Sequence, residues 1–143
     1  MESQYLIFDN PGTADISAFL NNAGNSVNSF RYFDKRPLSI IENHLVTCLI
    51  RDEAHNYVGY GHLDKDGDTV WLGIAVAEET RGKGLGKMIM SFLVKRAKDL
   101  SVESVQLSVD KTNTPAIHLY LSFGFAQAGL LNEKVQLMKL TIA

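Results

Sequence analysis

The stretch VWLGIAVAEETRGKGLGKMIM, residues Val70–Met90, contains three successive patterns. Val70–Val76 is almost wholly apolar and short enough to form a buried strand. Arg81–Lys87 then places glycine at every second position. From Leu85 to Leu100 the apolar residues recur at helical spacing. The stretch therefore predicts a strand, a tight turn and an amphipathic helix in that order.

A glycine-rich turn that enters a helix is suited to binding an anion. Glycine has no Cβ, so the backbone can turn sharply and approach a ligand closely. The first amides of the helix have no partner within it, and the helix dipole adds partial positive charge there. Arg81, Lys83 and Lys87 supply side-chain charge around the same turn. We therefore expect a phosphate or pyrophosphate group at this turn.

The spacing of the glycines excludes two common phosphate-binding motifs. A dinucleotide fingerprint needs G-x-G-x-x-G, whereas these glycines alternate. A P-loop needs glycine where Arg81 stands and serine or threonine where Met88 stands. The pattern R-G-x-G-x-G between a strand and an amphipathic helix instead resembles the GCN5-related N-acetyltransferase (GNAT) family. In that family the loop binds the pyrophosphate of acetyl-coenzyme A.

A second motif, NTPAIHLY at Asn113–Tyr120 followed by Phe123–Phe125, resembles the GNAT pattern N-x-x-A-x-x-L-Y-x-x-x-G-F. Two motifs in the family's order, separated by one helix and one strand, are a specific signal. The resemblance implies an α/β GNAT fold in which about four helices flank a central mixed sheet. That sheet has six to seven strands and is splayed in the middle. We expect residues 1–143 to form a single N-acetyltransferase domain.

The hydrophobic patterns elsewhere predict the remaining elements. Strands are expected at Gln4–Phe8, His44–Arg51, Tyr57–Leu63, Ser104–Val109, Phe125–Gly129 and Lys134–Thr141. Helices are expected after a cap at Thr13 or Asp15, as a short helix and loop over Ser26–Pro37, and from Thr114 to Gly124. The first half then reads as an antiparallel meander, and the long helix makes a right-handed parallel crossover.

Composition limits the classes of partner. A net charge of −2 argues against nucleic acid or an anionic membrane as the main partner. The chain has no apolar run long enough to span a bilayer and no signal-peptide pattern at its start. Its one cysteine, Cys48, cannot form an internal disulfide. We expect a cytoplasmic protein, and leave open whether it is a homodimer.

The resemblance implies acetyl-CoA as the co-substrate and no metal. Backbone groups of Ile74, Ala75 and Val76 would hold the pantetheine arm and polarise the thioester carbonyl. The pyrophosphate would lie on Arg81, Gly82, Lys83, Gly84, Leu85, Gly86 and Lys87. Asn113 and Ala116 would contact the cofactor arm or an ordered water.

Direct acetyl transfer needs an oriented amine, a route for its proton and a proton for the departing thiolate. Tyr120 is the candidate general acid, because a phenol is protonated at neutral pH. The alternative is a tyrosine that only packs in the core. Many GNAT relatives carry a glutamate base on the central strand, but Val70–Ala77 has no carboxylate. His62 shares one face of the preceding strand with Tyr60 and Asp64, and it can relay the amine proton through water. The alternative is that water alone is the base.

The acceptor is expected to contact the variable first half of the chain. Phe30, Arg31, Tyr32 and Arg36 combine aromatic rings with cations that can pair with phosphate. The resemblance implies transfer to a primary amine of a small molecule, and these residues would suit an amino sugar or a nucleotide-linked amino sugar. A packed aromatic face with solvated charges is the alternative reading of the same residues. A peptide N-terminus or lysine as acceptor, and a catalytically silent acyl-CoA sensor, also stay open.

Overall fold

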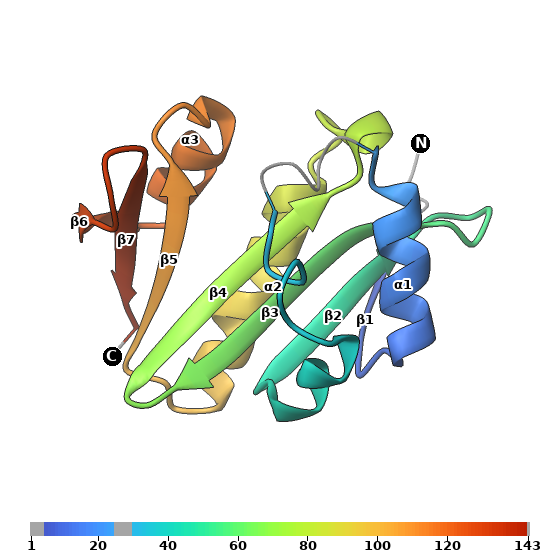
Figure 1. The fold of residues 1–143 in the computed structure, drawn as a ribbon, viewed down its shortest axis with the longest axis horizontal. Helices are drawn as coiled ribbons and strands as arrows, with labels where there is room; N and C mark the ends of the chain where they lie inside the picture. Colours follow the sequence, from blue (N-terminus) through green and yellow to red (C-terminus); the bar gives the residue numbers. More distant parts are fainter. Residues whose placement is uncertain (1–4, 25–29, 143) are drawn as a thin grey trace.

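The computed structural model describes residues 5–24 and 30–142. They form one seven-stranded sheet with the strand order β1-β2-β3-β4-β5-β7-β6 (Figure 1). The strands are β1 (Leu6–Asp9), β2 (Val46–Arg51), β3 (Tyr57–Asp66), β4 (Thr69–Val76), β5 (Ser104–Asp110), β6 (Ala126–Leu130) and β7 (Val135–Thr141). β4 and β5 run parallel, and the other neighbouring pairs are antiparallel. The predicted mixed sheet is confirmed.

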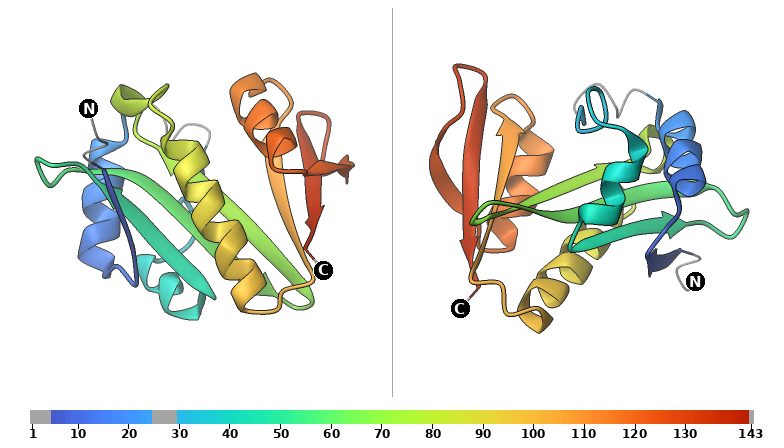
Figure 2. Two further views of the ribbon diagram at one scale, coloured as in Figure 1. Left: turned by 180° about the vertical axis from the view of Figure 1, so that it is seen from behind. Right: turned by 60° about the horizontal axis from the view of Figure 1, so that its bottom comes forward.

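Helices cover both faces of this sheet (Figure 2). The described helices are α1 (Thr13–Asn22), α2 (Leu85–Asp99) and α3 (Thr114–Ser122), with short 3₁₀ helices η2 (Leu38–Asn43) and η3 (Glu78–Thr80). The apolar stripe of α2 packs with residues of α3 in the larger core, whereas α1 and η2 contribute to a second core on the other face. None of the described helices is both long and apolar enough to cross a membrane.

The sheet divides between β4 and β5. β4 pairs with β3 along its whole length, from Thr69 opposite Asp66 to Val76 opposite Gly59. The ladder between β4 and β5 is a single pair, Trp71 with Gln106. Beyond that pair the two strands diverge (Figure 1), which confirms the predicted splay. We call this divergence the fork.

Two glycines of β3 let α2 lie close to the sheet. A Cβ on Gly61 would be 2.5 Å from Ile89 Cγ2 and 3.1 Å from Leu93 Cδ1. A Cβ on Gly59 would be 3.2 Å from Ile89 Cδ1. Because those contacts are too tight for a real side chain, the absence of side chains here sets how close α2 can come. This packing places the start of α2 near the end of β4.

Three element boundaries differ from the sequence expectation. Gly12, not Thr13 or Asp15, caps α1, and Asp15 accepts a hydrogen bond from the Gly12 amide (2.9 Å). In the expected short helix over Ser26–Pro37, residues 30–37 instead form turns and bends, and residues 26–29 lie outside the described part. The 3₁₀ helix η2 begins after Pro37, whose extended backbone makes it the N-cap.

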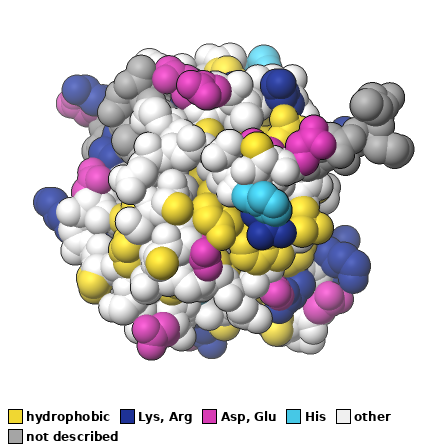
Figure 3. Space-filling model, turned by 90° about the vertical axis from the view of Figure 1, so that its right-hand side faces the viewer, with side chains coloured by type: hydrophobic (Ala, Val, Ile, Leu, Met, Phe, Trp, Pro, Cys, Tyr) yellow, Lys and Arg dark blue, Asp and Glu magenta, His cyan; other side chains and the backbone are white. Residues whose placement is uncertain are grey.

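The face over β1 and α1 carries acidic and basic side chains interspersed with hydrophobic ones (Figure 3). Leu6 on the β1 edge is 54% exposed. Arg51 lies over the ring of Phe8, 5.9 Å from its centroid. Mixed signs on this face agree with the nearly balanced charge of the whole chain.

Candidate active site

The turn before α2 has the backbone that the sequence predicts for an anion site. Gly82 and Gly84 have φ angles of 81° and 82°, and Gly84 is the N-cap of α2. A Cβ on either would meet no atom within 4 Å, so the positive φ, and not crowding, is what requires glycine. Lys83 and Lys87 are exposed beside the turn. The first turn of α2 carries no acidic residue, so the donors and charges present fit a diphosphate.

Gly86, in the first turn of α2, packs closely against α3, because a Cβ at Gly86 would lie 3.0 Å from Leu119 Cδ2. The two sequence motifs, far apart in the chain, therefore meet beside the fork. Asn113 is the N-cap of α3, and its Oδ1 accepts a hydrogen bond from the Ala116 amide (3.4 Å). Both residues are half-buried, so the cap presents them at the edge of the same region.

Ile74, Ala75 and Val76 form the end of β4, beyond the point where it pairs with β5. Ala75 is buried in the core beneath α1, whereas Ile74 and Val76 pack partly against the core beneath α2. The strand backbone between these two layers borders the fork. A chain with amide groups, such as the pantetheine arm, fits along such a strand edge.

Tyr120 lies on α3 in the larger core and is 7% exposed. Its ring is 6.0 Å from that of Phe125. No described residue hydrogen-bonds its hydroxyl, and no fully buried side-chain polar atom in the described part lacks a partner, so the hydroxyl keeps some exposure. Burial raises the pKa of Tyr120 above its usual value, so the phenol stays protonated at neutral pH. His118 is exposed on the same helix.

His62 lies on the opposite face of the sheet and is 2% exposed. Its Nδ1 is 2.7 Å from the hydroxyl of Tyr60, and its ring covers Gly73 of β4. Burial, and then the nearby His44 and Arg36, hold the pKa of His62 well below 6.5. The imidazole is therefore neutral at physiological pH.

A second group of polar side chains adjoins His62, and the sequence only partly revealed it. The Tyr32 hydroxyl donates to Asp64 Oδ2 (2.9 Å) and lies 2.6 Å from His44 Nε2. His44 Nδ1 is 2.8 Å from Thr47 Oγ1, and the ring centroids of His44 and His62 are 4.6 Å apart. Burial is the main cause that lowers the pKa of His44, and Asp64 opposes it. Alternation along β3 had grouped Asp64 with His62, but no local pattern connected them to Tyr32 or His44.

Three of the four residues predicted to contact the acceptor substrate pack on this network or belong to it. Phe30 lies with its ring centroid 5.2 Å from that of Tyr60. The guanidinium of Arg36 lies 4.3 Å from the Tyr32 ring centroid, and its Nη1 donates to the Tyr32 carbonyl (2.9 Å). The structure thus uses these residues to hold residues 30–36 against the sheet, and contact with an acceptor stays a prediction.

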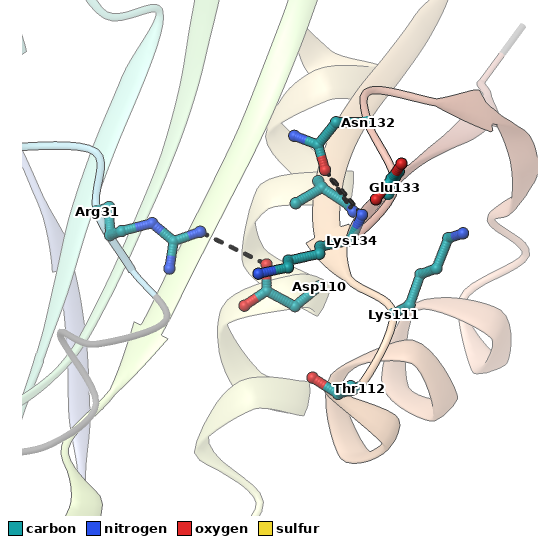
Figure 4. A pocket seen from close by; sticks show the side chains of 8 residues that line it. Arg31, Asp110, Lys111, Thr112, Asn132, Glu133 and Lys134 are labelled. Carbon is teal, nitrogen blue, oxygen red and sulfur yellow. Dashed lines mark hydrogen bonds and ion pairs between the residues drawn. The ribbon is translucent and has the colours of Figure 1, made fainter.

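Arg31, the fourth of these predicted residues, lines a cavity beside the ends of β5 and β7 (Figure 4). Its guanidinium pairs with Asp110 at the end of β5, with 3.5 Å between Nη2 and Oδ1. The cavity has a volume of about 550 Å³ and is lined by Arg31, Asp110, Lys111, Thr112, Asn132, Glu133, Lys134 and Val135. We call it the β5–β7 pocket. Its lining mixes basic and acidic side chains.

Comparison with known proteins gives the family. The Acetyltransferase (GNAT) family profile matches residues 16–125. A Bacillus subtilis protein described as uncharacterized N-acetyltransferase YobR is 35% identical over 97 residues, 68% of this chain and 32% of that protein. The chain spans only 17% to 32% of the length of the curated relatives that it matches first.

Solved structures share the whole fold. An N-acetyltransferase from Staphylococcus aureus Mu50 superposes with a TM-score of 0.82 at 18% identity, covering 99% of this chain and 100% of that one. The acetyltransferase yncA from Salmonella typhimurium, solved with its cofactor acetyl-CoA, superposes with a TM-score of 0.75 at 20% identity, covering 99% and 95%. With the glycine turn, the fork and the Asn113 cap in the places that both sequence motifs require, the chain belongs to the acetyltransferase (GNAT) family.

Proposed function

We propose that this chain is an acetyl-CoA-dependent N-acetyltransferase that acts on a primary amine of a small molecule. The observation that carries this proposal is the fork between β4 and β5, which lies between a diphosphate-type turn and the β5–β7 pocket. Cofactor and acceptor would meet there from opposite sides. Such a meeting point is what direct transfer without a covalent enzyme intermediate needs.

The cofactor would contribute an activated acetyl thioester when bound. The amides at the start of α2, with Lys83 and Lys87, would bind its pyrophosphate. The backbone of Ile74–Val76 would align its pantetheine arm and donate toward the thioester carbonyl. Asn113 and Ala116 would contact the same arm from α3.

Tyr120 and His62 lie on opposite faces of the sheet, in the layers of α2 and α1 respectively. This separation suits a reaction in which the amine arrives from one side and the thiol leaves toward the other. We assign Tyr120 as the acid that protonates the leaving thiolate. His62 stays the predicted neighbour of the amine, where it would orient a water or the acceptor.

The charges around the β5–β7 pocket favour an acceptor that carries an anionic group beside its amine. Arg31 and Lys134 can pair with phosphate or carboxylate, and Asp110 and Glu133 can accept hydrogen bonds from hydroxyl groups of the acceptor. A nucleotide-linked amino sugar has both features, and a simple amino sugar has the amine alone.

We also propose that the protein works in the cytoplasm. Cys48 is fully buried, and burial raises the pKa of its thiol to about 12. Such a thiol is not a nucleophile. The support for the cytoplasm is that the single cysteine cannot form an internal disulfide, which fits a reducing compartment.

Thiol release from acetyl-CoA, measured against a panel of amines and followed by mass spectrometry of the products, tests the proposal. The panel should contain amino sugars, nucleotide-linked amino sugars, polyamines and short peptides. Acetylation of a small amine is the expected result, and acetylation of peptides alone would favour the peptide alternative. Saturable acetyl-CoA binding without turnover for any acceptor would favour the sensor.

The Tyr120→Phe variant should reduce kcat by about 10²–10⁴-fold and leave acetyl-CoA affinity nearly unchanged, because only the hydroxyl is removed. Tyr57→Phe is the matched control, since the Tyr57 hydroxyl donates to Asp15 (2.7 Å) on α1, away from the fork. Wild-type kcat in Tyr120→Phe, measured where chemistry limits the rate, would remove Tyr120 from the mechanism.

A further inference from the structure

The hydrogen bond between Tyr60 and His62 determines which nitrogen of His62 carries its proton. Tyr60 is 0% exposed, and within the described residues its hydroxyl has one hydrogen-bond partner, His62 Nδ1 at 2.7 Å. A buried hydroxyl proton without an acceptor is costly, so Tyr60 donates to Nδ1. The proton of the neutral imidazole then lies on Nε2. Both nitrogens of His62 are therefore unable to accept a proton in this arrangement.

The hydrogen bonds around Tyr32 assign the protons of His44 in the same way. The Tyr32 hydroxyl has one proton and two neighbours, Asp64 Oδ2 at 2.9 Å and His44 Nε2 at 2.6 Å. A carboxylate carries no proton, so the hydroxyl donates to Asp64 and accepts from His44 Nε2. His44 Nδ1 then accepts from the Thr47 hydroxyl, 2.8 Å away. His44 also has no nitrogen left to act as a base.

Asp64 is the member of this network that keeps an acceptor atom. Its Oδ2 accepts from Tyr32, and Oδ1 has no hydrogen-bond partner among the described residues. Asp64 is half-buried on β3 opposite Trp71, the residue at which β4 pairs with β5. Tyr32, which donates the hydrogen bond to Asp64, is the residue after Arg31, and Arg31 lines the β5–β7 pocket. The carboxylate thus lies at the closed end of the fork, on the face held by residues 30–36.

Resting on the proposed acetyl transfer, we propose that Asp64 binds the acceptor ammonium and accepts its proton, and that Tyr32 and His44 position the carboxylate. The ammonium passes one proton through Asp64 to solvent, which frees the nitrogen lone pair. The N–C bond then forms, the second N–H proton passes to Asp64, and the C–S bond breaks. The sulfur takes its proton from Tyr120, which regains one from solvent, and Asp64 then releases its second proton to solvent. Two protons leave the nitrogen, one ends on the thiol, and one is released.

The test compares Asp64→Asn with Asp66→Asn in the acetyl-CoA and amine assay. Asparagine keeps the size of Asp64 and can still accept from Tyr32. Asp66 is two positions further along the same strand, on the same side and exposed, so it is a matched control. We expect kcat to fall about 10²–10⁴-fold in Asp64→Asn, with acetyl-CoA affinity unchanged and no effect of Asp66→Asn. Thermal unfolding of both variants verifies that they fold.

Chemical rescue separates a proton acceptor from a structural carboxylate. Sodium formate should restore part of the turnover of Asp64→Ala, because the small anion can occupy the vacated space. Tyr32→Phe should lower kcat less than Asp64→Asn and leave KM for acetyl-CoA unchanged. An Asp64→Asn enzyme within about threefold of wild type, or an inactive Asp64→Ala enzyme that formate does not rescue, would overturn the assignment. Wild-type protein that acetylates no amine would instead refute the proposed function itself.

Discussion

At the scale of single residues, Gly73 of β4 and His62 of β3 fit closely across the two strands beside the fork. A Cβ on Gly73 would lie 2.6 Å from both Cε1 and Nε2 of His62. Gly73→Ala should therefore displace the ring and lower the free energy of unfolding by about 1–3 kcal/mol, measured by urea denaturation. Removing the ring should relieve the clash, so the same substitution should cost less in a His62→Ala background. Additive effects, within about 0.5 kcal/mol, would show that the ring moves away freely.

At the scale of elements, the sequence predicted best where a residue's own neighbours decide its structure. The stripe from Leu85 onward predicted α2, and its residues Leu85, Ile89 and Leu93 are buried. Short apolar runs predicted β3 and β4 correctly, although β3 runs on to Asp66. Residues 30–36 were the main failure, because their aromatic rings pack on β3 and the conformation is set by those distant partners. The same reason hid the Asp64–Tyr32–His44 connection, which joins three separate segments.

The turn before α2 can be tested against a second turn of the same backbone class. Gly84 and Gly67 both have positive φ, 82° and 61°, and a Cβ on either would meet no atom within 4 Å. Alanine at either site should cost a similar backbone strain of about 1–2 kcal/mol. Only Gly84→Ala should also weaken acetyl-CoA binding, by about tenfold or more, because the backbone amides of this turn would face the pyrophosphate. Equal affinities of the two variants in isothermal titration would place the diphosphate elsewhere.

At the scale of the whole molecule, the buried histidines make stability depend on pH. The pKa values of His44 and His62 are held below 6.5 mainly by burial. Below about pH 6.5 the unfolded chain binds protons that the folded chain does not, so stability falls as the pH drops toward the folded pKa values. Asp15, whose pKa is lowered from 3.8 chiefly by its hydrogen bond from Tyr57, adds a further loss at lower pH. The Tm should therefore decrease between about pH 7.5 and about pH 5.

The double variant His44→Gln, His62→Gln should flatten this decrease, and His118→Gln, an exposed substitution on α3, should not. Glutamine offers a carbonyl oxygen to Tyr60 and an amide donor to Tyr32, so both neighbouring hydroxyls keep partners. An unchanged slope in the double variant would assign the acid sensitivity to other groups.

The single pair that closes the fork has a practical consequence. Trp71, which makes that pair with Gln106, is the only tryptophan of the chain. It is half-buried and stands opposite Asp64 on β3. The indole fluorescence therefore comes from a single position, the closed end of the fork, and responds to the polarity and charge around it. Cofactor and acceptor titrations can be followed on the unlabelled protein, with the chain's own fluorescence as the reporter.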